Sequence, residues 1–197
     1  MTGQLSPFRH CPQCAEPSGC ASAREFRCEH CGFRYFHNVA AAASAFMVHD
    51  GHLLLTRRAQ APAAGTLDLP GGFVDPDESL EDALARELHE ELALTVATSD
   101  MRYLFSLPNR YEFAGIIYNT ADSFYRVDYA TRPAVLARDD VAAAMWVAMN
   151  EIATQEIGLE SVRAALERFL GETRRTESEF VGSTIDQFEC TQDQSRR

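Results

Sequence analysis

Apolar and polar positions between residues 80 and 92 follow the period of an α-helix. Leucine and alanine recur there every three or four residues, at Leu80, Ala83, Leu84, Leu88 and Leu92. One face of this segment is therefore apolar and the opposite face polar. Ser79 precedes the pattern and is a residue type that caps helix N-termini. The pattern predicts an amphipathic helix that packs on a core through its leucine face.

Shorter apolar runs elsewhere predict strands. Residues 39–48 and 53–58 flank a His-Asp-Gly turn and predict a β-hairpin, and residues 67–72 form a short apolar run broken at Pro70. Further strands are expected at residues 101–106, 116–119, 123–129 and 144–147, and a second helix at residues 159–170. Residues 130–140 are expected to form a polar loop, and residues 174–197 a polar tail of uncertain order.

The polar face of the first predicted helix concentrates carboxylates. Glu87, Glu90 and Glu91 stand within reach of one another across one helical turn, and Arg86 is the only cation inside the group. Crowded carboxylates repel one another, so a purely structural role would cost stability. Bound Mg²⁺ or Mn²⁺ would resolve the repulsion, because hard cations prefer carboxylate oxygens and leave positions for water and substrate phosphate. The pattern favours metal-assisted phosphate chemistry over a solvated acidic face.

This stretch resembles the signature of the Nudix hydrolase family. The matching positions are Gly72, Glu78, Arg86, Glu87, Leu88, Glu90, Glu91 and Leu94. One position departs, because Ala93 stands where the family has glycine. A glycine after a helix typically adopts a left-handed conformation, and alanine there costs about 1 kcal/mol. The departure concerns the geometry of the helix end, while the chemical groups are all present.

The resemblance implies a set of metal ligands and a pair of orienting residues. The ligands would be Glu87, Glu91, Glu90 and the carbonyl of Gly71. Which of Glu87 and Glu91 would act as a catalytic base is left open. Glu78 and Arg86 would form a pair that holds the preceding loop on the helix. The implied architecture is an α/β fold of the α+β type, a mixed sheet sandwiched between helices with the metal at its edge.

Residues outside the glutamate group are candidates for catalysis or substrate contact. Arg57 and Arg58 end a strand beside the expected active-site loop, where either could pair with a phosphate, although a solvated position is equally compatible. Gly72 would let the backbone approach the substrate closely. Asp140 precedes the strand around Trp146, where Nudix relatives often keep a late acidic ligand or catalytic base, and the alternative role is loop capping.

Two Cys-x-x-Cys pairs near the N-terminus form a second signal. Cys11 and Cys14 are separated from Cys28 and Cys31 by thirteen residues, a spacing typical of a zinc ribbon. Four thiolates close a tetrahedral shell, so the expected Zn²⁺ is structural. Disulfides are the alternative interpretation, but the first residues lack the apolar run of a secretory signal, which favours a cytoplasmic protein.

Composition agrees with a two-part chain. The 197 residues, 46% of them hydrophobic, suffice for one core plus a small module stabilised by metal. We expect a zinc ribbon at residues 1–37, a Nudix hydrolase domain at 38–172 and a polar C-terminal tail at 173–197. A net charge of −11 argues against general nucleic-acid binding, and no run is long enough to span a membrane. The chain contains no lysine, which excludes Schiff-base chemistry and a phosphate-binding P-loop lysine.

The region after the signature bears on specificity. Zinc-bearing Nudix enzymes that cleave dinucleotide cofactors carry the motif Ser-Gln-Pro-Trp-Pro-Phe-Pro, of which this chain keeps only scattered residues such as Ser106 and Pro108. Nearby, Tyr111 and Phe113 could stack on a base or pack in the core, and the core is the favoured interpretation.

The prediction is a Mg²⁺-dependent hydrolase that cleaves the pyrophosphate of a nucleoside diphosphate linked to another moiety. The expected partner is a small-molecule nucleotide, with ADP-ribose favoured, and a homodimer is left open. An NADH or NAD pyrophosphatase is the first alternative. A non-catalytic Nudix-fold binding or regulatory module is the second, although such a module has no need for a costly carboxylate cluster.

Overall fold

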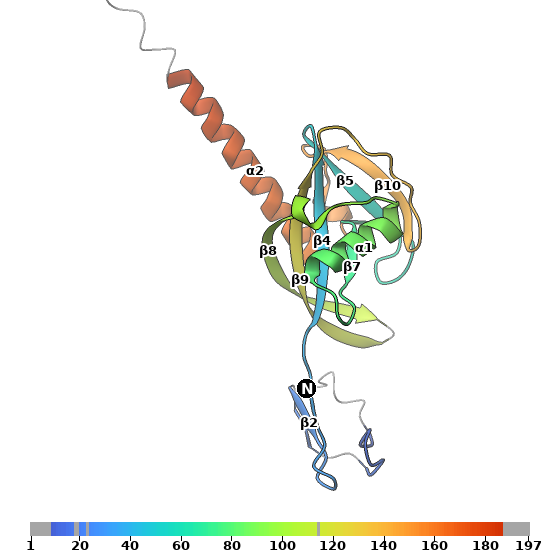
Figure 1. Ribbon diagram of the computed structural model, residues 1–197. Helices are drawn as coiled ribbons and strands as arrows, with labels where there is room; N and C mark the ends of the chain where they lie inside the picture. The colour runs from blue at the N-terminus through green and yellow to red at the C-terminus, as the bar shows by residue number, and fades with distance from the viewer. Residues whose placement is uncertain (1–8, 18–19, 23, 114, 187–197) are drawn as a thin grey trace, which may run out of the picture.

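The computed structural model describes residues 9–17, 20–22, 24–113 and 115–186. Figure 1 shows a small N-terminal sheet followed by a larger body of strands and helices. The elements, in chain order, are β1 (Cys20–Ala21), β2 (Glu25–Arg27), β3 (Arg34–Phe36), β4 (Ala40–His49), β5 (His52–Arg58), β6 (Leu67–Asp68), β7 (Gly71–Phe73), α1 (Leu80–Leu92), η1 (Thr98–Asp100), β8 (Arg102–Phe113), β9 (Ile116–Asp128), β10 (Val141–Ala148), η2 (Thr154–Glu156) and α2 (Glu160–Asp186).

The main sheet is mixed. Its path runs β10-β5-β4-β9-β8, with β6 added to β5 and β7 added to β4. Strands β4 and β9 pair in parallel, while the other neighbours on this path pair antiparallel. The expected hairpin of β4 and β5 forms, although the two strands pair only at their turn.

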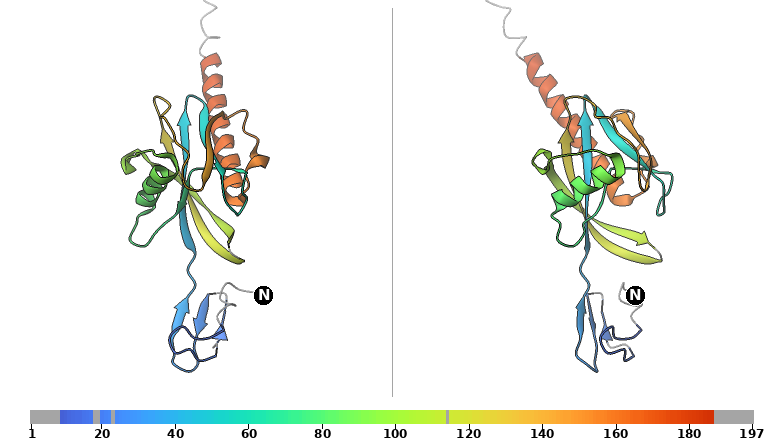
Figure 2. Two further views of the ribbon diagram at one scale, coloured as in Figure 1. Left: turned by 90° about the vertical axis from the view of Figure 1, so that its right-hand side faces the viewer. Right: turned by 45° about the vertical axis from the view of Figure 1, so that its right-hand side comes forward.

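Two separate cores lie on the two faces of this sheet, because successive side chains of β4 point to opposite faces. Ala43, Ala45 and Met47 pack with the leucines of α1, whereas Phe46 packs with Phe169 of α2 at a ring-centroid distance of 4.2 Å. Figure 2 shows the sheet between the two helices. The expected architecture of a mixed sheet sandwiched between helices is confirmed.

The splitting of β4 from β5 creates the place where the site forms. Beyond their turn, β4 takes β7 as its partner and β5 takes β6, so the short segment 67–73 bridges the two strands. Gly71 allows this close approach. It has a φ of +133°, and a Cβ there would collide with the carbonyl oxygen of Ala43.

Helix α1 begins and ends as the sequence predicts. The Ser79 hydroxyl accepts a hydrogen bond from the backbone N–H of Asp82, a standard N-cap contact. Ala93 adopts the left-handed conformation expected of glycine, with φ 57° and ψ 28°, and its N–H donates to the carbonyl of His89 at 3.0 Å. The helix end therefore keeps its geometry without a glycine.

Several boundaries differ from the sequence predictions. Strand β8 continues past residue 106 to Phe113, and the two strands expected between 116 and 129 form one strand, β9. The cross-strand pairing of these long partners overrides the interruption expected around residues 107–115. Phe113 is 54% exposed and Tyr111 lines a cavity, so the expectation of core packing for these two rings was wrong.

The C-terminal segment is helical over part of its length. Helix α2 continues across the boundary expected at residues 172 and 173 as far as Asp186. The remaining part of the expected tail, 187–197, and residues 1–8 of the expected ribbon lie outside the described residues. None of the helices in the described part of the chain is long and apolar enough to cross a membrane.

Candidate functional site

The guanidinium of Arg86 organises the start of α1. Its Nε and Nη2 donate to the two carboxylate oxygens of Glu78 at 2.8 and 2.9 Å, in the parallel geometry that suits an arginine fork. Its Nη2 also donates to the carbonyl of Phe73, and its Nη1 donates to Glu87 and Glu90 at 2.8 and 3.0 Å. Arg86 thereby ties the loop after β7 to the helix and orients two glutamates.

Gly72 makes room for Glu87. A Cβ at position 72 would lie 2.5 Å from the carboxyl carbon of Glu87, closer than real Cβ contacts allow. The Glu87 carboxylate therefore rests directly against the backbone of β7. Burial raises its pKa, a shift that Arg86 opposes and that Glu90 and Asp140 reinforce.

Glu91 is the most buried carboxylate of the helix, with 7% of its surface exposed. Its Oε2 accepts a hydrogen bond from the backbone N–H of Gly71 at 3.0 Å. Burial raises its pKa to about 9, with further upward contributions from the charges of Asp140, Glu87 and Asp68. A buried carboxylate in such an acidic environment is poised to take up a cation or a proton.

A cavity of about 110 Å³ opens beside these glutamates. Gly71 and Gly72 form part of its wall, so the cavity begins where the two glutamates touch β7. Asp140 also lines it, and the charge of Asp140 acts on both Glu87 and Glu91. The structure therefore brings Asp140, expected only from its place in the chain, to the glutamate group.

The two candidate arginines have different environments. Arg58 lines the cavity, where its Nη1 pairs with the carboxylate of Asp68 at 2.7 Å and its Nε donates to the carbonyl of Pro62. Arg57 instead donates to the carbonyl of Gly65, and it is not among the described residues that line the cavity. Of the two, only Arg58 is positioned to meet a ligand in this cavity.

Glu90 lies at the edge of the group. Its side chain is 48% exposed and is held by Arg86.

Gly71 contacts the glutamate group through its backbone N–H, which donates a hydrogen bond to Glu91. The expectation that the carbonyl of Gly71 binds metal remains a prediction.

Sequence reasoning missed several residues of the cavity. Asp68 is buried and pairs with Arg58, and its only signal was an acidic residue inside the apolar run 67–69. Asp122 was missed because residues 120–122 fell between two expected strands. Tyr111, for which core packing was favoured over stacking on a base, instead lines the cavity and meets Phe73 edge to face at 5.4 Å.

The carboxylates suit a hard divalent cation by their chemistry. Glu87, Glu91 and Asp140 offer oxygen ligands, which Mg²⁺ and Mn²⁺ prefer. Burial is the largest cause of the raised pKa of both glutamates, and the negative charge of Asp140 adds to it. Their oxygens are not gathered at ligand distances, since among the described residues only the four cysteines form such a group. Arg86 draws Glu87 away and Gly71 holds Glu91, so binding of a cation requires side-chain adjustment.

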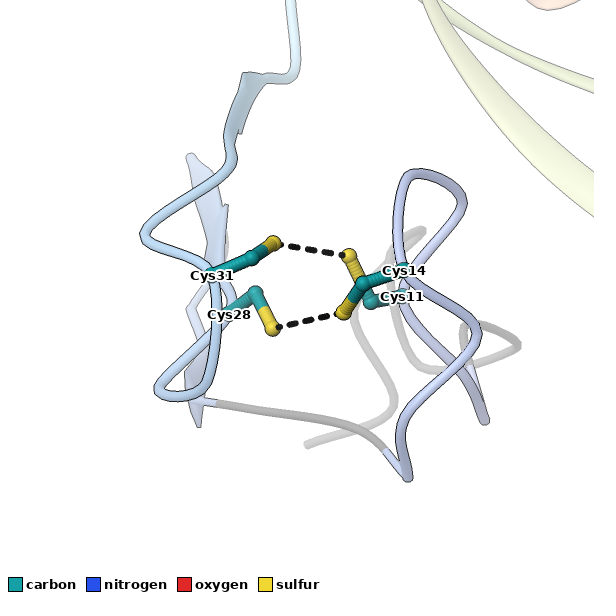
Figure 3. Close-up of side chains that lie close together, drawn as sticks. All are labelled: Cys11, Cys14, Cys28 and Cys31. Carbon is teal, nitrogen blue, oxygen red and sulfur yellow. Dashed lines mark hydrogen bonds between the residues drawn. The ribbon is translucent and has the colours of Figure 1, made fainter.

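The four cysteines form a compact cluster, as Figure 3 shows. All their sulfur atoms lie within 4.8 Å of one another, and the Cys11–Cys31 and Cys14–Cys28 pairs are each 3.7 Å apart. A tetrahedron with Zn–S bonds of about 2.3 Å has sulfur atoms about 3.8 Å apart. The distances fit a shared zinc ion and exclude disulfides between these cysteines.

The ribbon environment acts differently on the individual thiols. Burial and the neighbouring cysteines raise the pKa of Cys14 to about 12 and also raise that of Cys31. Backbone hydrogen bonds, the largest from the N–H of Cys31, lower the pKa of the Cys28 thiol to about 6. The fold of this small module depends on the metal, because its buried core consists of Phe26 with Cys11 and Cys28. No histidine of the described residues belongs to the cluster.

Comparison with known proteins places the larger body in one family. The model of the NUDIX domain matches residues 38–170. A NUDIX hydrolase from Nitrosomonas europaea has the same fold, with a TM-score of 0.66 over 85% of this chain and 93% of that chain at 19% identity.

Curated relatives match shorter stretches. An ADP-ribose pyrophosphatase from Methanocaldococcus jannaschii is 33% identical over 78 residues, which are 40% of this chain and 46% of the relative. An NAD-capped RNA hydrolase NudC from Edwardsiella ictaluri is 35% identical over 110 residues, which are 53% of this chain and 42% of the relative. The chain thus spans less than half the length of either protein.

Proposed function

The chain belongs to the Nudix family, and from this premise we propose that it is a divalent-cation-dependent hydrolase that cleaves the pyrophosphate of a nucleoside diphosphate linked to another moiety. ADP-ribose is the favoured substrate. The observation that carries the proposal is the meeting of Glu87, Glu91 and Asp140 beside the cavity that Arg58 lines. Support for the substrate comes from the relative named ADP-ribose pyrophosphatase.

The proposed ligands of Mg²⁺ or Mn²⁺ are Glu87, Glu91 and Glu90, with the carbonyl of Gly71. When bound, the cation polarises a phosphoryl oxygen and lowers the pKa of water. Glu91 and Glu87 supply the inner carboxylates because both lie against Gly71 and Gly72 of β7, which line the cavity. Glu90 is the outermost of the three and is proposed as a ligand that acts through water.

Arg86 is a positioning residue in this proposal. Its donors are engaged by Glu78, Glu87, Glu90 and the carbonyl of Phe73. Because these contacts fix the loop, the helix and the Glu87 carboxylate together, the arginine holds the site in shape.

Arg58 is the proposed phosphate-binding residue. Asp68 and Pro62 fix its guanidinium in the cavity wall, so little conformational entropy is lost when a phosphate binds. Asp68 also compensates the arginine charge within the protein, which favours release of the products. Gly72 lets the diphosphate approach the backbone of β7 beside Glu87.

Asp140 is the proposed proton acceptor. Its side chain lines the cavity in which the diphosphate would lie. A water oxygen forms a bond to one phosphorus while its proton passes to the Asp140 carboxylate. The bond from that phosphorus to the bridging oxygen breaks, and two phosphate monoesters leave. Glu87 and Glu91 remain the alternative bases.

Hydrolysis in ¹⁸O-labelled water with product identification tests the proposed function. ADP-ribose should yield AMP and ribose 5-phosphate, with one labelled oxygen in one of the two products. A screen of nucleoside diphosphate derivatives under the same conditions ranks the alternatives. Binding of ADP-ribose without turnover in either Mg²⁺ or Mn²⁺ would instead indicate the non-catalytic binding module.

A second candidate is hydrolysis of NADH or NAD. The relative named NAD-capped RNA hydrolase NudC favours it, as does the four-cysteine cluster that accompanies the Nudix domain. Zn²⁺ bound by Cys11, Cys14, Cys28 and Cys31 is the proposed structural cofactor in either case. Free thiols in this cluster fit a reducing compartment, which supports the expected cytoplasmic location.

A further inference from the structure

Asp122 is a buried carboxylate in the cavity that the proposed reaction does not use. It lies on β9, is 8% exposed, and lines the cavity together with Arg58 and Asp140. Among the described residues it forms no ion pair, since Arg58 pairs with Asp68. Burial of an unpaired carboxylate is costly, so its hydrogen bonds and its neighbours determine what it can bind.

Two hydroxyl groups hold the Asp122 carboxylate in place. Thr120 donates to Oδ1 at 2.5 Å, and Ser161, at the start of α2, donates to Oδ2 at 2.6 Å. Thr120 and Ser161 are 3% and 4% exposed, so solvent does not compete for these bonds. An ionised carboxylate has about four acceptor positions. Each of the two oxygens can therefore accept one further hydrogen bond. These two acceptor positions lie side by side on one rigid carboxylate.

The strand register places Asp122 at a defined distance from the phosphate chemistry. Ala42 of β4 pairs with Asp122 on one side and with Phe73 of β7 on the other. Adjacent strands are about 4.8 Å apart, so two strand spacings of roughly 10 Å separate Asp122 from β7. Gly72, against which Glu87 rests, is the neighbour of Phe73. Asp122 and Glu87 lie on opposite faces of the sheet, but Gly71 and Gly72 line the same cavity as Asp122, so a sugar beside Asp122 can be attached to a diphosphate at β7.

The cavity around Asp122 has the size and lining for a small ring. Its volume of about 110 Å³ corresponds to three or four waters at about 30 Å³ each. Ala42 and Ser44 keep its floor open, and Leu159 and Val162 supply an apolar wall. Beside Asp122 a phosphate would be repelled by the carboxylate, so the phosphate belongs at Arg58, whereas a neutral group with two adjacent O–H donors would satisfy Asp122.

Building on the proposed function, we infer that Asp122, held by Thr120 and Ser161, accepts hydrogen bonds from the vicinal hydroxyl groups of a substrate ribose. This assigns the part of the cavity beside Asp122 to a sugar. Asp122 is then a specificity-determining residue, because an analogue that lacks one hydroxyl leaves a buried acceptor unsatisfied.

The test measures binding, so that it does not depend on turnover. Isothermal titration calorimetry of the wild-type protein in Mg²⁺ would compare a non-hydrolysable, methylene-bridged ADP-ribose with two derivatives. One derivative lacks the 2-hydroxyl of the adenosine ribose, and the other lacks the 2-hydroxyl of the terminal ribose. We expect one of the two to bind at least about tenfold more weakly than the parent.

Asp122→Asn provides the second measurement. It keeps the side-chain volume but removes the charge and one acceptor, so the parent should bind about tenfold more weakly and the discrimination against the deoxy analogue should largely disappear. Asp128→Asn is the matched control, because this aspartate lies on the same strand but is exposed and pairs with Arg126. The control should retain the discrimination in full.

The outcomes separate this inference from the proposed function. If both deoxy derivatives bind wild-type protein as tightly as the parent, or if none of the three binds, the ribose site is refuted. An equal loss for all three ligands in Asp122→Asn would also overturn it, since that is the effect of a structural role. Selective binding combined with no hydrolysis of ADP-ribose would uphold the ribose site and refute the hydrolase.

Discussion

Arg86 and Glu78 are joined by two parallel hydrogen bonds of 2.8 and 2.9 Å that link the loop after β7 to helix α1. The same guanidinium orients Glu87 and Glu90. A lysine would keep the charge but cannot reproduce this fork. We therefore expect Arg86→Lys to weaken Mg²⁺ binding about tenfold or more and to lower the melting temperature by a few degrees. Calorimetric titration with Mg²⁺ and thermal unfolding measure the two effects.

Arg126→Lys is the matched control for this substitution. Arg126 also pairs with a carboxylate through two nitrogens, but that partner, Asp128, is exposed on β9 and outside the site. Its replacement should leave Mg²⁺ affinity unchanged. Equal Mg²⁺ affinity of wild type and Arg86→Lys would show that the fork does not shape the metal site.

Glu91→Gln should lower turnover by at least about a hundredfold while keeping the fold. Glutamine preserves the side-chain volume and can still accept from the N–H of Gly71, but it removes a charged ligand. The measurement is kcat at saturating Mg²⁺, beside a circular dichroism spectrum. Glu156→Gln, at an exposed position in η2, makes the same chemical change as a control and should retain wild-type kcat. Near wild-type turnover of Glu91→Gln would mean that the metal lies elsewhere.

The pH dependence of stability without divalent cation should also depend on Glu91. Burial raises its pKa from 4.5 to about 9 in the folded protein. Below about pH 4.5 both states hold the proton. Between these values the unfolded chain releases the Glu91 proton and the folded chain retains it. The free energy of unfolding therefore falls as the pH rises towards 9. In EDTA, the melting temperature should therefore fall over this range, and less steeply in Glu91→Gln.

Glu87 and Asp68 shift in the same direction and contribute to the same fall, so the informative quantity is the difference between wild type and Glu91→Gln. Added Mg²⁺ should reduce the fall in the wild-type protein, because the cation binds the ionised form. Parallel melting curves of the two proteins across this range would rule out the raised pKa as the cause.

The sequence predicted those parts of the site that depend on local spacing. Arg86, Glu87, Glu90 and Glu91 lie within about two turns of one helix, and the left-handed end at Ala93 follows from the position of the helix. Residues that reach the site through long-range pairing could not be predicted in this way. Asp122 enters the cavity only because β9 pairs in parallel with β4.

The main error in the structure predicted from the sequence was the length of the strands. Residues 107–115, which include Pro108, Asn109 and Gly115, fell between two predicted strands and were assigned to neither. Pairing of β8 with β9 holds Pro108 and Asn109 within a strand. Tyr111 consequently lines the cavity, whereas an isolated segment gave no reason to prefer the cavity over the core.

The cysteine cluster predicts about one zinc per chain. Sulfur separations of 3.7 Å match a tetrahedral site, so elemental analysis of the purified protein should find one equivalent of zinc. Cys28→Ser should lose this zinc and the folded ribbon, while Mg²⁺ binding by the Nudix domain persists, since α1, which carries Glu87 and Glu91, packs through its leucines in a core separate from that of the ribbon. Zinc that remains after all four cysteines are changed to serine would refute the assignment.

Substrate preference gives the last prediction: NADH should be hydrolysed no better than ADP-ribose. Both substrates contain the adenosine and the pyrophosphate, so discrimination in favour of NADH requires contacts to its nicotinamide half. The motif that supplies specificity in zinc-bearing dinucleotide hydrolases is absent, and the strand that replaces it, β8, brings only Asn109 and Tyr111 to the cavity. Without such contacts, the transition state for NADH loses binding free energy of a few kcal/mol.

Measuring kcat/KM for both substrates in one Mg²⁺ buffer checks the prediction. If NADH were preferred by tenfold or more, Asn109, Tyr111 and Phe73 would be the residues to test next, because apart from Gly71 and Gly72 they are the residues that β7 and β8 place at the cavity.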